Sequence, residues 1–230
     1  MKDIIGPKCI GVIMDGNRRW AKKNNLQTLE GHRKGYAKLK DFLAWAKENK
    51  VEAVIAYALS KENWKRTQEE VGYLMDLLRF ALAHEIKTLT KEDTRLIFIG
   101  DKSAFPKDIQ EMMAKAEEDT KNNKGTILGI AASYGGRDEI LHAAEKFSGK
   151  EKRMEKINEA EFSSALWTKN LPDPDIVIRT GGQKRLSGFL PWQSVYSELF
   201  FTDTLWPDLP EEEFKGILIE YAERQRNFGK

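Results

Sequence analysis

The sequence contains a single cysteine, Cys9, and only three histidines among its 230 residues. One cysteine forms no disulfide within the chain and excludes zinc sites built from several thiolates. The histidines, His32, His84 and His142, are too far apart along the sequence to indicate a metal-binding cluster. A chain without a disulfide framework is typical of a reducing compartment, so we expect a cytoplasmic protein.

Long apolar runs and an excess of charge of one sign are missing as well. No segment approaches the ~18 apolar residues that span a bilayer, and residues 1–10 lack an apolar stretch of signal-peptide length. The 38 basic and 36 acidic residues leave a formal charge of +2. This balance argues against a general affinity for nucleic acid, including a nucleic-acid-binding module built on the basic residues of 18–23.

What the sequence does contain is an alternation of short apolar runs with segments of helical period. The runs are typical of strands buried on both faces of a parallel sheet, and they occupy residues 9–14, 53–59, 95–99, 126–132 and 175–178. Helices are expected at 35–49, 68–89, 107–122, 137–147, 159–167 and 211–226, and the charged stretch 149–156 is expected to be a solvated connection. No segment is typical of an interdomain linker. The pattern therefore predicts one α/β domain over residues 1–230, with a central, mostly parallel sheet flanked by helices.

The expected helix at 68–89 is unusual because its first half is apolar on nearly all sides. Thr67 and Glu70 form a capping-box pattern in front of it. A helix of this kind must be covered on more than one side. Core packing, a subunit partner and an apolar ligand are all compatible with this requirement.

Polar or glycine-containing clusters follow every expected strand, at 15–20, 60–66, 100–101, 133–137 and 179–182. Ligands of open parallel sheets bind outside the carboxyl ends of the strands, so the clusters predict one site. These loops and their neighbours carry six arginines: Arg18, Arg19, Arg66, Arg137, Arg179 and Arg185. Guanidinium groups and exposed backbone amides suit phosphate oxygens, so a phosphate ester or diphosphate is the expected ligand. Asp15 is placed either to pair with these arginines or to hold a hard cation.

Several signature motifs are missing from the sequence. It has no P-loop, no Gly-x-Gly-x-x-Gly, no Gly-x-Ser-x-Gly and no Asp-Asp-x-x-Asp, which argues against nucleotide-binding, hydrolase and all-helical prenyl synthase folds. An anion-binding crevice beside an apolar helix instead suggests an amphiphilic substrate with a diphosphate at one end and a hydrocarbon at the other.

Seven motifs occur in order along the chain: Met-Asp-Gly-Asn-Arg-Arg-Trp-Ala at 14–21, Gly-His-Arg at 31–33, Ser-Lys-Glu-Asn-Trp-Lys-Arg at 60–66, Tyr-Gly-Gly-Arg at 134–137, Arg-Thr-Gly-Gly at 179–182, Arg-Leu-Ser at 185–187, and Trp-Gln-Ser-Val-Tyr-Ser-Glu at 192–198, followed by Leu-Phe-Phe. Each alone is weak, but together they are specific. Through them the sequence resembles the cis-prenyltransferases of the undecaprenyl diphosphate synthase family over about residues 9–229.

The resemblance implies successive addition of isopentenyl diphosphate to an allylic diphosphate primer such as farnesyl diphosphate, with each new double bond cis. The implied product is a medium- or long-chain polyprenyl diphosphate such as undecaprenyl diphosphate, the lipid carrier precursor for cell-wall and glycan synthesis. The resemblance also implies a Mg²⁺ cofactor, a homodimer, an apolar tunnel between sheet and helices, and transient contact with a membrane surface during product release.

The same resemblance assigns roles to individual residues. Asp15 would hold or deliver Mg²⁺, and Glu198 would be the second carboxylate on the metal. Asn63 is assigned with Ser60 to the proton-removal step; because a neutral amide is a poor base, we expect Asn63 to orient isopentenyl diphosphate while a phosphate oxygen takes the proton. The primer diphosphate would be held by Gly16, Asn17, Arg18, Arg19, His32 and Arg66, and isopentenyl diphosphate by Arg179, Arg185 and Ser187. Their motif neighbours Trp20, Lys61, Glu62, Trp64 and Leu186 are assigned to substrate binding as well.

These assignments have structural alternatives. Asp15 is also placed to cap the following helix, His32 to bond backbone near a helix start, and Glu198 to pair with an arginine. Trp20, Trp64 and Trp192 are also compatible with core positions. A catalytically silent partner subunit of the same fold is the second functional hypothesis, although such subunits typically lose the first motif, which is retained here.

Some positions depart from the common bacterial pattern: Thr28, Leu59, Ser133, Gln183, Lys184, Gly188 and Pro191. None of them alters Asp15, Asn63, Arg179, Arg185 or Glu198. The departures therefore bear on primer preference and metal affinity rather than on the reaction.

Overall fold

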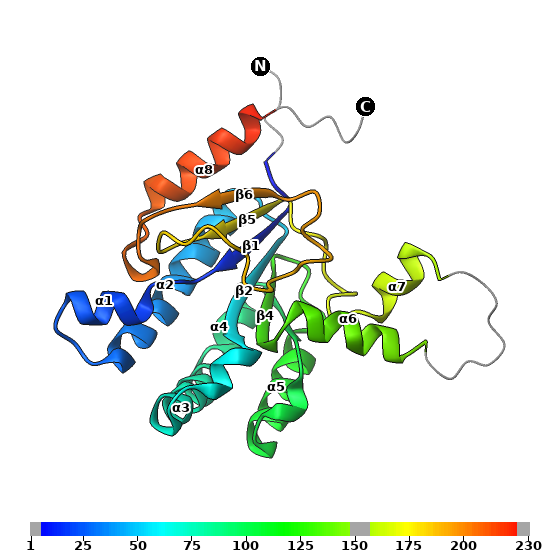
Figure 1. Cartoon of the computed structure of the whole chain (residues 1–230), viewed down its shortest axis with the longest axis horizontal. Helices are drawn as coiled ribbons and strands as arrows, with labels where there is room; N and C mark the ends of the chain where they lie inside the picture. The colour runs from blue at the N-terminus through cyan, green and yellow to red at the C-terminus, as the bar shows by residue number, and fades with distance from the viewer. Residues whose placement is uncertain (1–5, 148–156, 225–230) are drawn as a thin grey trace.

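The computed structural model describes residues 6–147 and 157–224, and these form an α/β domain around one parallel sheet (Figure 1). The expected connection at 149–156 and the end of the expected helix 211–226 lie outside the described residues. The six strands are β1 (Cys9–Ile13), β2 (Ala53–Ser60), β3 (Arg95–Ile99), β4 (Ile127–Tyr134), β5 (Ile176–Arg179) and β6 (Glu198–Phe201). Their order in the sheet is β3-β4-β2-β1-β5-β6, and all pairings are parallel.

Eight α-helices are present in the described residues: α1 (Asn17–Lys23), α2 (Thr28–Glu48), α3 (Gln68–His84), α4 (Ile86–Lys91), α5 (Lys107–Thr120), α6 (Gly136–Glu145), α7 (Glu159–Ala165) and α8 (Glu211–Glu223). Short 3-10 helices, η1 (Lys61–Lys65), η2 (Lys102–Ala104) and η3 (Trp206–Asp208), follow β2, β3 and β6. The α/β class and the parallel sheet predicted from the sequence are confirmed.

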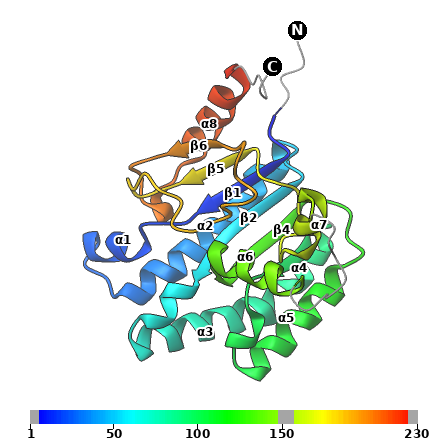
Figure 2. The same ribbon diagram turned by 45° about the vertical axis from the view of Figure 1, so that its right-hand side comes forward.

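The alternation of side chains along each strand creates two core layers. On one face, Val12 and Ala56 belong to the cluster that includes Phe42 of α2, Met75 of α3 and Phe214 of α8. On the other face, strand residues pack with the loops near 167–171 and 186–190, while α6 and α7 share a small cluster of their own. Figure 1 shows α7 at the right of the sheet and α3 below it, and Figure 2 shows the same fold turned by 45°. The strands are therefore covered on both faces, as their unbroken apolar runs require.

The second helix begins earlier than the sequence pattern predicts, at Thr28 rather than at residue 35. Gly31 and Gly35 lie inside it, where they let α1 approach closely. A Cβ at Gly31 would lie 2.1 Å from the Asn17 carbonyl oxygen, and one at Gly35 would lie 2.3 Å from Asn17 Oδ1. Gly31 and Gly35 are thus packing positions that let the start of α1 at Asn17 lie against α2.

The expected helix 68–89 is divided at Glu85 into α3 and α4. No proline or glycine stands at this point, so the local sequence carries no signal for the break. Glu85 instead makes a tertiary contact, accepting a hydrogen bond from Lys40 Nζ of α2 at 2.9 Å. Strand β6 was not expected, and the helix after Asp15 was given no bounds, because segments of four and seven residues are too short to show a clear period.

Candidate active site

Asp15 lies where β1 leaves the sheet, and its backbone is held from three sides. Its N–H donates to Ile13 O at 2.9 Å, and its carbonyl accepts from Trp206 N at 3.0 Å and from Thr180 Oγ1 at 2.7 Å. Gly16 follows with φ +118, and a Cβ there would come within 3.0 Å of Leu205. Position 16 therefore needs glycine both for its backbone conformation and for lack of space. The loops that follow β1, β5 and β6 meet at Asp15.

The Asp15 carboxylate lies between two guanidinium groups. Oδ1 accepts from Arg19 Nη2 at 3.0 Å, and Oδ2 accepts from Arg179 Nη2 at 2.9 Å. Arg179 is only 5% exposed, and its Nη1 also donates to Ser187 Oγ at 2.8 Å and to the Arg185 carbonyl. The structure thus brings Asp15 and Arg19 of the primer motif together with Arg179 and Ser187 of the isopentenyl diphosphate motifs. Asp15 caps no helix: its side chain is used by the arginines, and α1 has no side-chain cap.

Arg19 also ties this cluster to the glycine loop after β5. Its Nη1 donates to Gly181 O at 2.6 Å. Gly181 has φ +81, and a Cβ there would lie 2.4 Å from Arg19 Nη2. A larger residue would therefore displace the guanidinium from Asp15.

A second cluster gathers around Glu70 at the start of α3. Its Oε1 lies 2.8 Å from Arg66 Nη1, 3.1 Å from His32 Nε2 and 3.9 Å from Arg18 Nε. Burial lowers the pKa of His32 below its ordinary 6.5, in spite of Glu70. Burial alone would raise the pKa of Glu70, but His32, Arg66 and Arg18 together bring it below its ordinary value. Glu70 thus holds three of the residues predicted to bind the primer, and His32 bonds a carboxylate rather than backbone.

The segment after β2 places its residues in several roles. Asn63 Oδ1 accepts from Ser60 N at 3.1 Å, in a capping box that starts η1. Trp64 Nε1 donates to Ser133 Oγ at 2.9 Å while its ring packs edge-on against Phe105 at 5.2 Å. The Trp64 side chain is therefore half-buried, and these contacts tie it to the fold. The Glu62 side chain is exposed.

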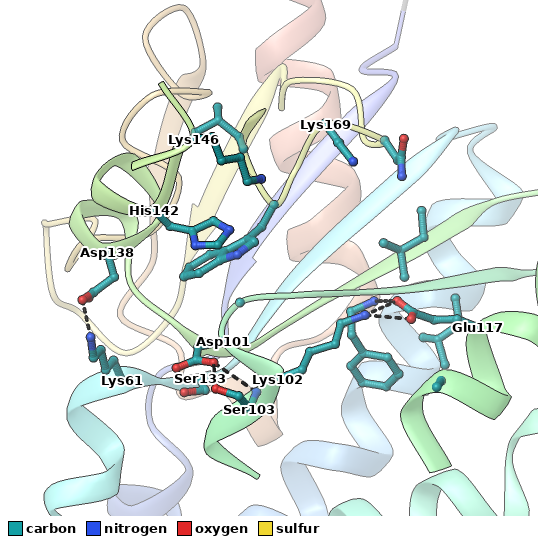
Figure 3. Close-up of a pocket in the computed structure, with 18 of the residues that line it drawn as sticks. Lys61, Asp101, Lys102, Ser103, Glu117, Ser133, Asp138, His142, Lys146 and Lys169 are labelled. Atoms are coloured by element: carbon teal, nitrogen blue, oxygen red, sulfur yellow. Dashed lines mark hydrogen bonds and ion pairs between the residues drawn. The ribbon is translucent and has the colours of Figure 1, made fainter. Parts of the chain in front are cut away.

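Lys61 lines a different hollow. Its ammonium pairs with Asp138 of α6 in an open polar groove of about 1080 Å³ that also includes Asp101, Lys102 and His142 (Figure 3).

The other predicted tryptophans are also tied to the fold. Trp20 Nε1 donates to Asp208 Oδ1 at 2.6 Å, and Trp192 Nε1 donates to Ser163 Oγ at 3.0 Å beside the Phe162 ring. Leu186 packs against the core layer of Phe189. Trp20, Trp192 and Leu186 therefore each make contacts that hold parts of the fold together.

Glu198 is not brought to Asp15 within one chain. It starts β6 in register with Ile176, whereas the strand end near Asp15 is marked by the pairs Ile13–Arg179 and Arg179–Phe201. Glu198 and Phe201 are three residue steps apart along β6, which corresponds to a distance of about 10 Å. The Glu198 carboxylate pairs with Arg224, as the structural alternative expected. Within residues 6–147 and 157–224, no group of three or more His, Cys, Asp or Glu residues could hold a metal ion.

An apolar cavity of about 210 Å³ begins beside Asn17 and His32 and extends between the sheet and helices α2 and α3. Its walls include Leu74, Leu78 and Leu82 of α3. The strand positions Leu128, Ile130 and Ala132 of β4 line it at every second residue. The nearly all-round apolar character of α3 is thus used partly for the core and partly for this cavity, which corresponds to the expected tunnel.

Sequence reasoning missed two functional partners. Glu70 was read only as a helix-capping residue, although its position four residues after Arg66 could have indicated an ion pair. Thr180, which anchors the Asp15 carbonyl, gave no signal beyond its place in the Arg-Thr-Gly-Gly motif.

The fold and site together define an α/β enzyme whose strand-end loops concentrate guanidinium groups around a carboxylate at the mouth of an apolar cavity. A family model described as undecaprenyl diphosphate synthase matches residues 13–229. The ditrans,polycis-undecaprenyl-diphosphate synthase ((2E,6E)-farnesyl-diphosphate specific) of Haemophilus influenzae is 42% identical over 227 residues, which are 97% of this chain and 95% of that protein. The Escherichia coli K12 protein of the same name is 42% identical over 228 residues, 97% of this chain and 90% of that one.

Among solved structures, lavandulyl diphosphate synthase from Lavandula x intermedia, in complex with dimethylallyl diphosphate, superposes with a TM-score of 0.94 at 34% identity. The match covers 99% of this chain and 100% of that one. The chain belongs to the undecaprenyl diphosphate synthase family and is a prenyltransferase of the cis type.

Proposed function

We propose that this protein condenses isopentenyl diphosphate repeatedly onto an allylic diphosphate primer, farnesyl diphosphate or a similar molecule, and releases a medium- or long-chain polyprenyl diphosphate such as undecaprenyl diphosphate. The observation that carries the proposal is the apolar cavity that opens at Asn17 and His32, next to the arginines around Asp15 and Glu70. An amphiphilic diphosphate needs both environments side by side. The names of the relatives and the allylic diphosphate bound in the lavender enzyme support the same substrate class.

In this proposal the primer diphosphate binds at Gly16 and the first turn of α1, which carries Asn17, Arg18 and Arg19, with help from His32 and Arg66. The guanidinium groups of Arg19 and Arg66 are already fixed by hydrogen bonds to Asp15, Gly181 O and Glu70. A departing diphosphate accumulates negative charge, and donors that are fixed beforehand stabilise that charge without reorganisation. The hydrocarbon tail of the primer would lie in the adjacent cavity.

Isopentenyl diphosphate would be held by Arg179, Arg185 and Ser187. Arg179 already contacts the carbonyl of Arg185 and the hydroxyl of Ser187, so these three groups move as one unit. The Oδ1 of Asn63 is occupied by Ser60 N–H, which leaves the amide N–H₂ of Asn63 for a substrate oxygen. A phosphate oxygen, rather than this neutral amide, is proposed to accept the proton that leaves carbon.

Asp15 fits a role in holding Mg²⁺. Mg²⁺ in phosphate-handling enzymes is commonly bound by one or two carboxylates together with substrate phosphates, and the Asp15 carboxylate is 29% exposed at the site. When bound, Mg²⁺ neutralises charge on the diphosphate. Arg19 and Arg179 each donate one hydrogen bond to a different Asp15 oxygen, and each oxygen keeps a further lone pair that could bind the ion. A contribution from Glu198 of the same chain would require a large movement and is not part of this proposal.

We further propose that the protein is a cytoplasmic homodimer whose product release involves brief contact with a membrane surface. Val195, Tyr196 and Leu199 are exposed at and just before the edge strand β6, a placement that suits a subunit partner. In the described part of the chain, no helix has the length and apolarity needed to cross a bilayer.

The test is an assay with Mg²⁺, labelled isopentenyl diphosphate and primers of two lengths, followed by separation of the products. Polyprenyl products from the wild type, and their loss in Asp15→Ala, are expected. The absence of such products with either primer would overturn the proposal and favour a catalytically silent subunit.

A further inference from the structure

The apolar cavity carries one group of polar side chains in its wall, away from its mouth. Apart from Asn17 and His32, which belong to the diphosphate site, its polar lining consists of Tyr36, Lys40 and Glu85. We call these three residues the wall cluster. They have no role in the proposed reaction.

Helical spacing places the wall cluster farther from the diphosphate site than Asn17 and His32, which lie at the mouth of the cavity. His32, Tyr36 and Lys40 follow one another at intervals of four residues on α2, so they form one stripe in which Lys40 lies about 12 Å beyond His32. Glu85 stands at the break between α3 and α4 and accepts from Lys40 Nζ at 2.9 Å. Helices α2 and α3 are therefore joined at His32–Glu70 near the mouth and at Lys40–Glu85 beyond it, with the apolar cavity between these contacts.

The wall cluster is an unfavourable neighbour for hydrocarbon. The Tyr36 hydroxyl is buried and faces the Glu85 carboxylate, so the cluster keeps its polar groups turned toward one another. Burial, and then the nearby Glu85 carboxylate, raise the pKa of Tyr36, so its hydroxyl stays protonated. Burial alone would raise the pKa of Glu85, but Tyr36 and Lys40 bring it below its ordinary value. A methylene chain that advances past these groups must remove water from an ion pair and offers no hydrogen bond in return.

We propose that the wall cluster limits product length, by opposing further advance of the hydrocarbon end of the growing chain. This inference rests on the proposed elongation reaction. New units are added at the diphosphate end, so every condensation pushes the far end of the chain along the cavity toward Tyr36, Lys40 and Glu85. Elongation slows when the next unit must be forced against the ion pair, and release of the product then competes.

The test compares product lengths from farnesyl diphosphate and labelled isopentenyl diphosphate for the wild type, Glu85→Leu and Tyr36→Phe. Glu85→Leu removes the carboxylate and leaves an apolar wall, whereas Tyr36→Phe removes only one oxygen and is expected to leave the fold intact. The matched control is Glu92→Leu. Glu92 pairs with Lys47 of α2 at 2.5 Å, again bridging α2 to the end of α4, but neither residue lines the cavity.

We expect Glu85→Leu to shift the main product by at least one isoprene unit toward longer chains, Tyr36→Phe to shift it in the same direction but less, and Glu92→Leu to leave it unchanged. Unchanged lengths in both cavity variants, or an equal shift in the control, would overturn the inference while the proposed reaction stands. Should Glu85→Leu fail to fold, Tyr36→Phe decides the outcome.

A binding measurement separates the two proposals. Unreactive thiolodiphosphate analogues of farnesyl diphosphate and of a longer allylic diphosphate are titrated into each variant. We expect Glu85→Leu to tighten binding of the longer analogue at least threefold relative to the shorter one. Equal affinity changes for both analogues would contradict a length limit, whereas failure of the wild type to bind either analogue would count against the proposed function itself.

Discussion

Replacing Glu139 with alanine should lower the free energy of unfolding by about 3–5 kcal/mol, because several buried donors lose their acceptor, at about 1–3 kcal/mol for each group left unsatisfied, and buried side-chain volume is lost. Glu139 is 0% exposed. Its Oε1 accepts from Thr168 N at 3.0 Å and from Thr168 Oγ1 at 3.2 Å. Its Oε2 accepts from Tyr134 Oη at 2.5 Å and from Gln193 Nε2 at 3.0 Å. Alanine would leave these donors buried without an acceptor and would open a cavity.

Glutamine at the same position should cost less, about 1–2 kcal/mol. The new amide can keep its oxygen toward Thr168 and turn its N–H₂ toward Tyr134 and Gln193. Tyr134 Oη is able to accept, and Gln193 has a buried Oε1 without a partner in the described chain. A flip of the Gln193 amide would satisfy the new donor but give up the hydrogen bond from Gln193 Nε2 to Thr168 Oγ1, which is the source of the remaining cost.

The assay is urea unfolding of the wild type, Glu139→Ala, Glu139→Gln and Glu111→Ala, with free energies from linear extrapolation. Glu111 is an exposed residue of α5 and serves as the control. An Ala variant within 1 kcal/mol of this control, or a Gln variant as unstable as the Ala variant, would refute the reasoning.

Three other predictions concern the site. Asp15→Asn should reduce kcat/KM by about 100-fold or more, because Arg19 and Arg179 lose their charged partner and the metal its carboxylate, and a loss below threefold in steady-state assays would contradict this. Arg66→Lys should raise KM for the primer by roughly tenfold through loss of the contact with Glu70, while KM for isopentenyl diphosphate should change little. Burial lowers the pKa of His32 from 6.5, and the hydrogen bond with His32 together with the charges of Arg66 and Arg18 lowers that of Glu70 from 4.5, so the unfolded chain binds more protons than the folded chain at these groups. The stability contributed by His32 is complete above pH 6.5 and declines as the pH falls below it, and that contributed by Glu70 is lost at lower pH. In denaturation curves, the free energy of unfolding of His32→Gln should therefore decline less between pH 7 and 5 than that of the wild type. Identical slopes for the two proteins would argue against this.

The strands were the most predictable part of the fold. The run Cys9–Ile13 is apolar and buried at every position because both faces of the sheet are covered, and this leaves a direct signal in the sequence. The convergence of Asp15, Arg19 and Arg179 was also predictable, since the carboxyl ends of parallel strands share one edge.

Other features depend on pairing that no local pattern records. The distance between Glu198 and Asp15 follows from the register of β6 against β5, which is set by tertiary packing. The break at Glu85 and the contact of Glu70 with His32 likewise require knowledge of how α2 lies against α3. The residues of the cavity wall could be recognised only after that arrangement was known.

The measurement that tests the central claim most directly is NMR of the polyprenyl product made from farnesyl diphosphate and ¹³C-labelled isopentenyl diphosphate. The account predicts several labelled units in one chain, each joined through a cis double bond, with the diphosphate retained at the last unit. A product with trans double bonds, or recovery of both substrates unchanged, would contradict it.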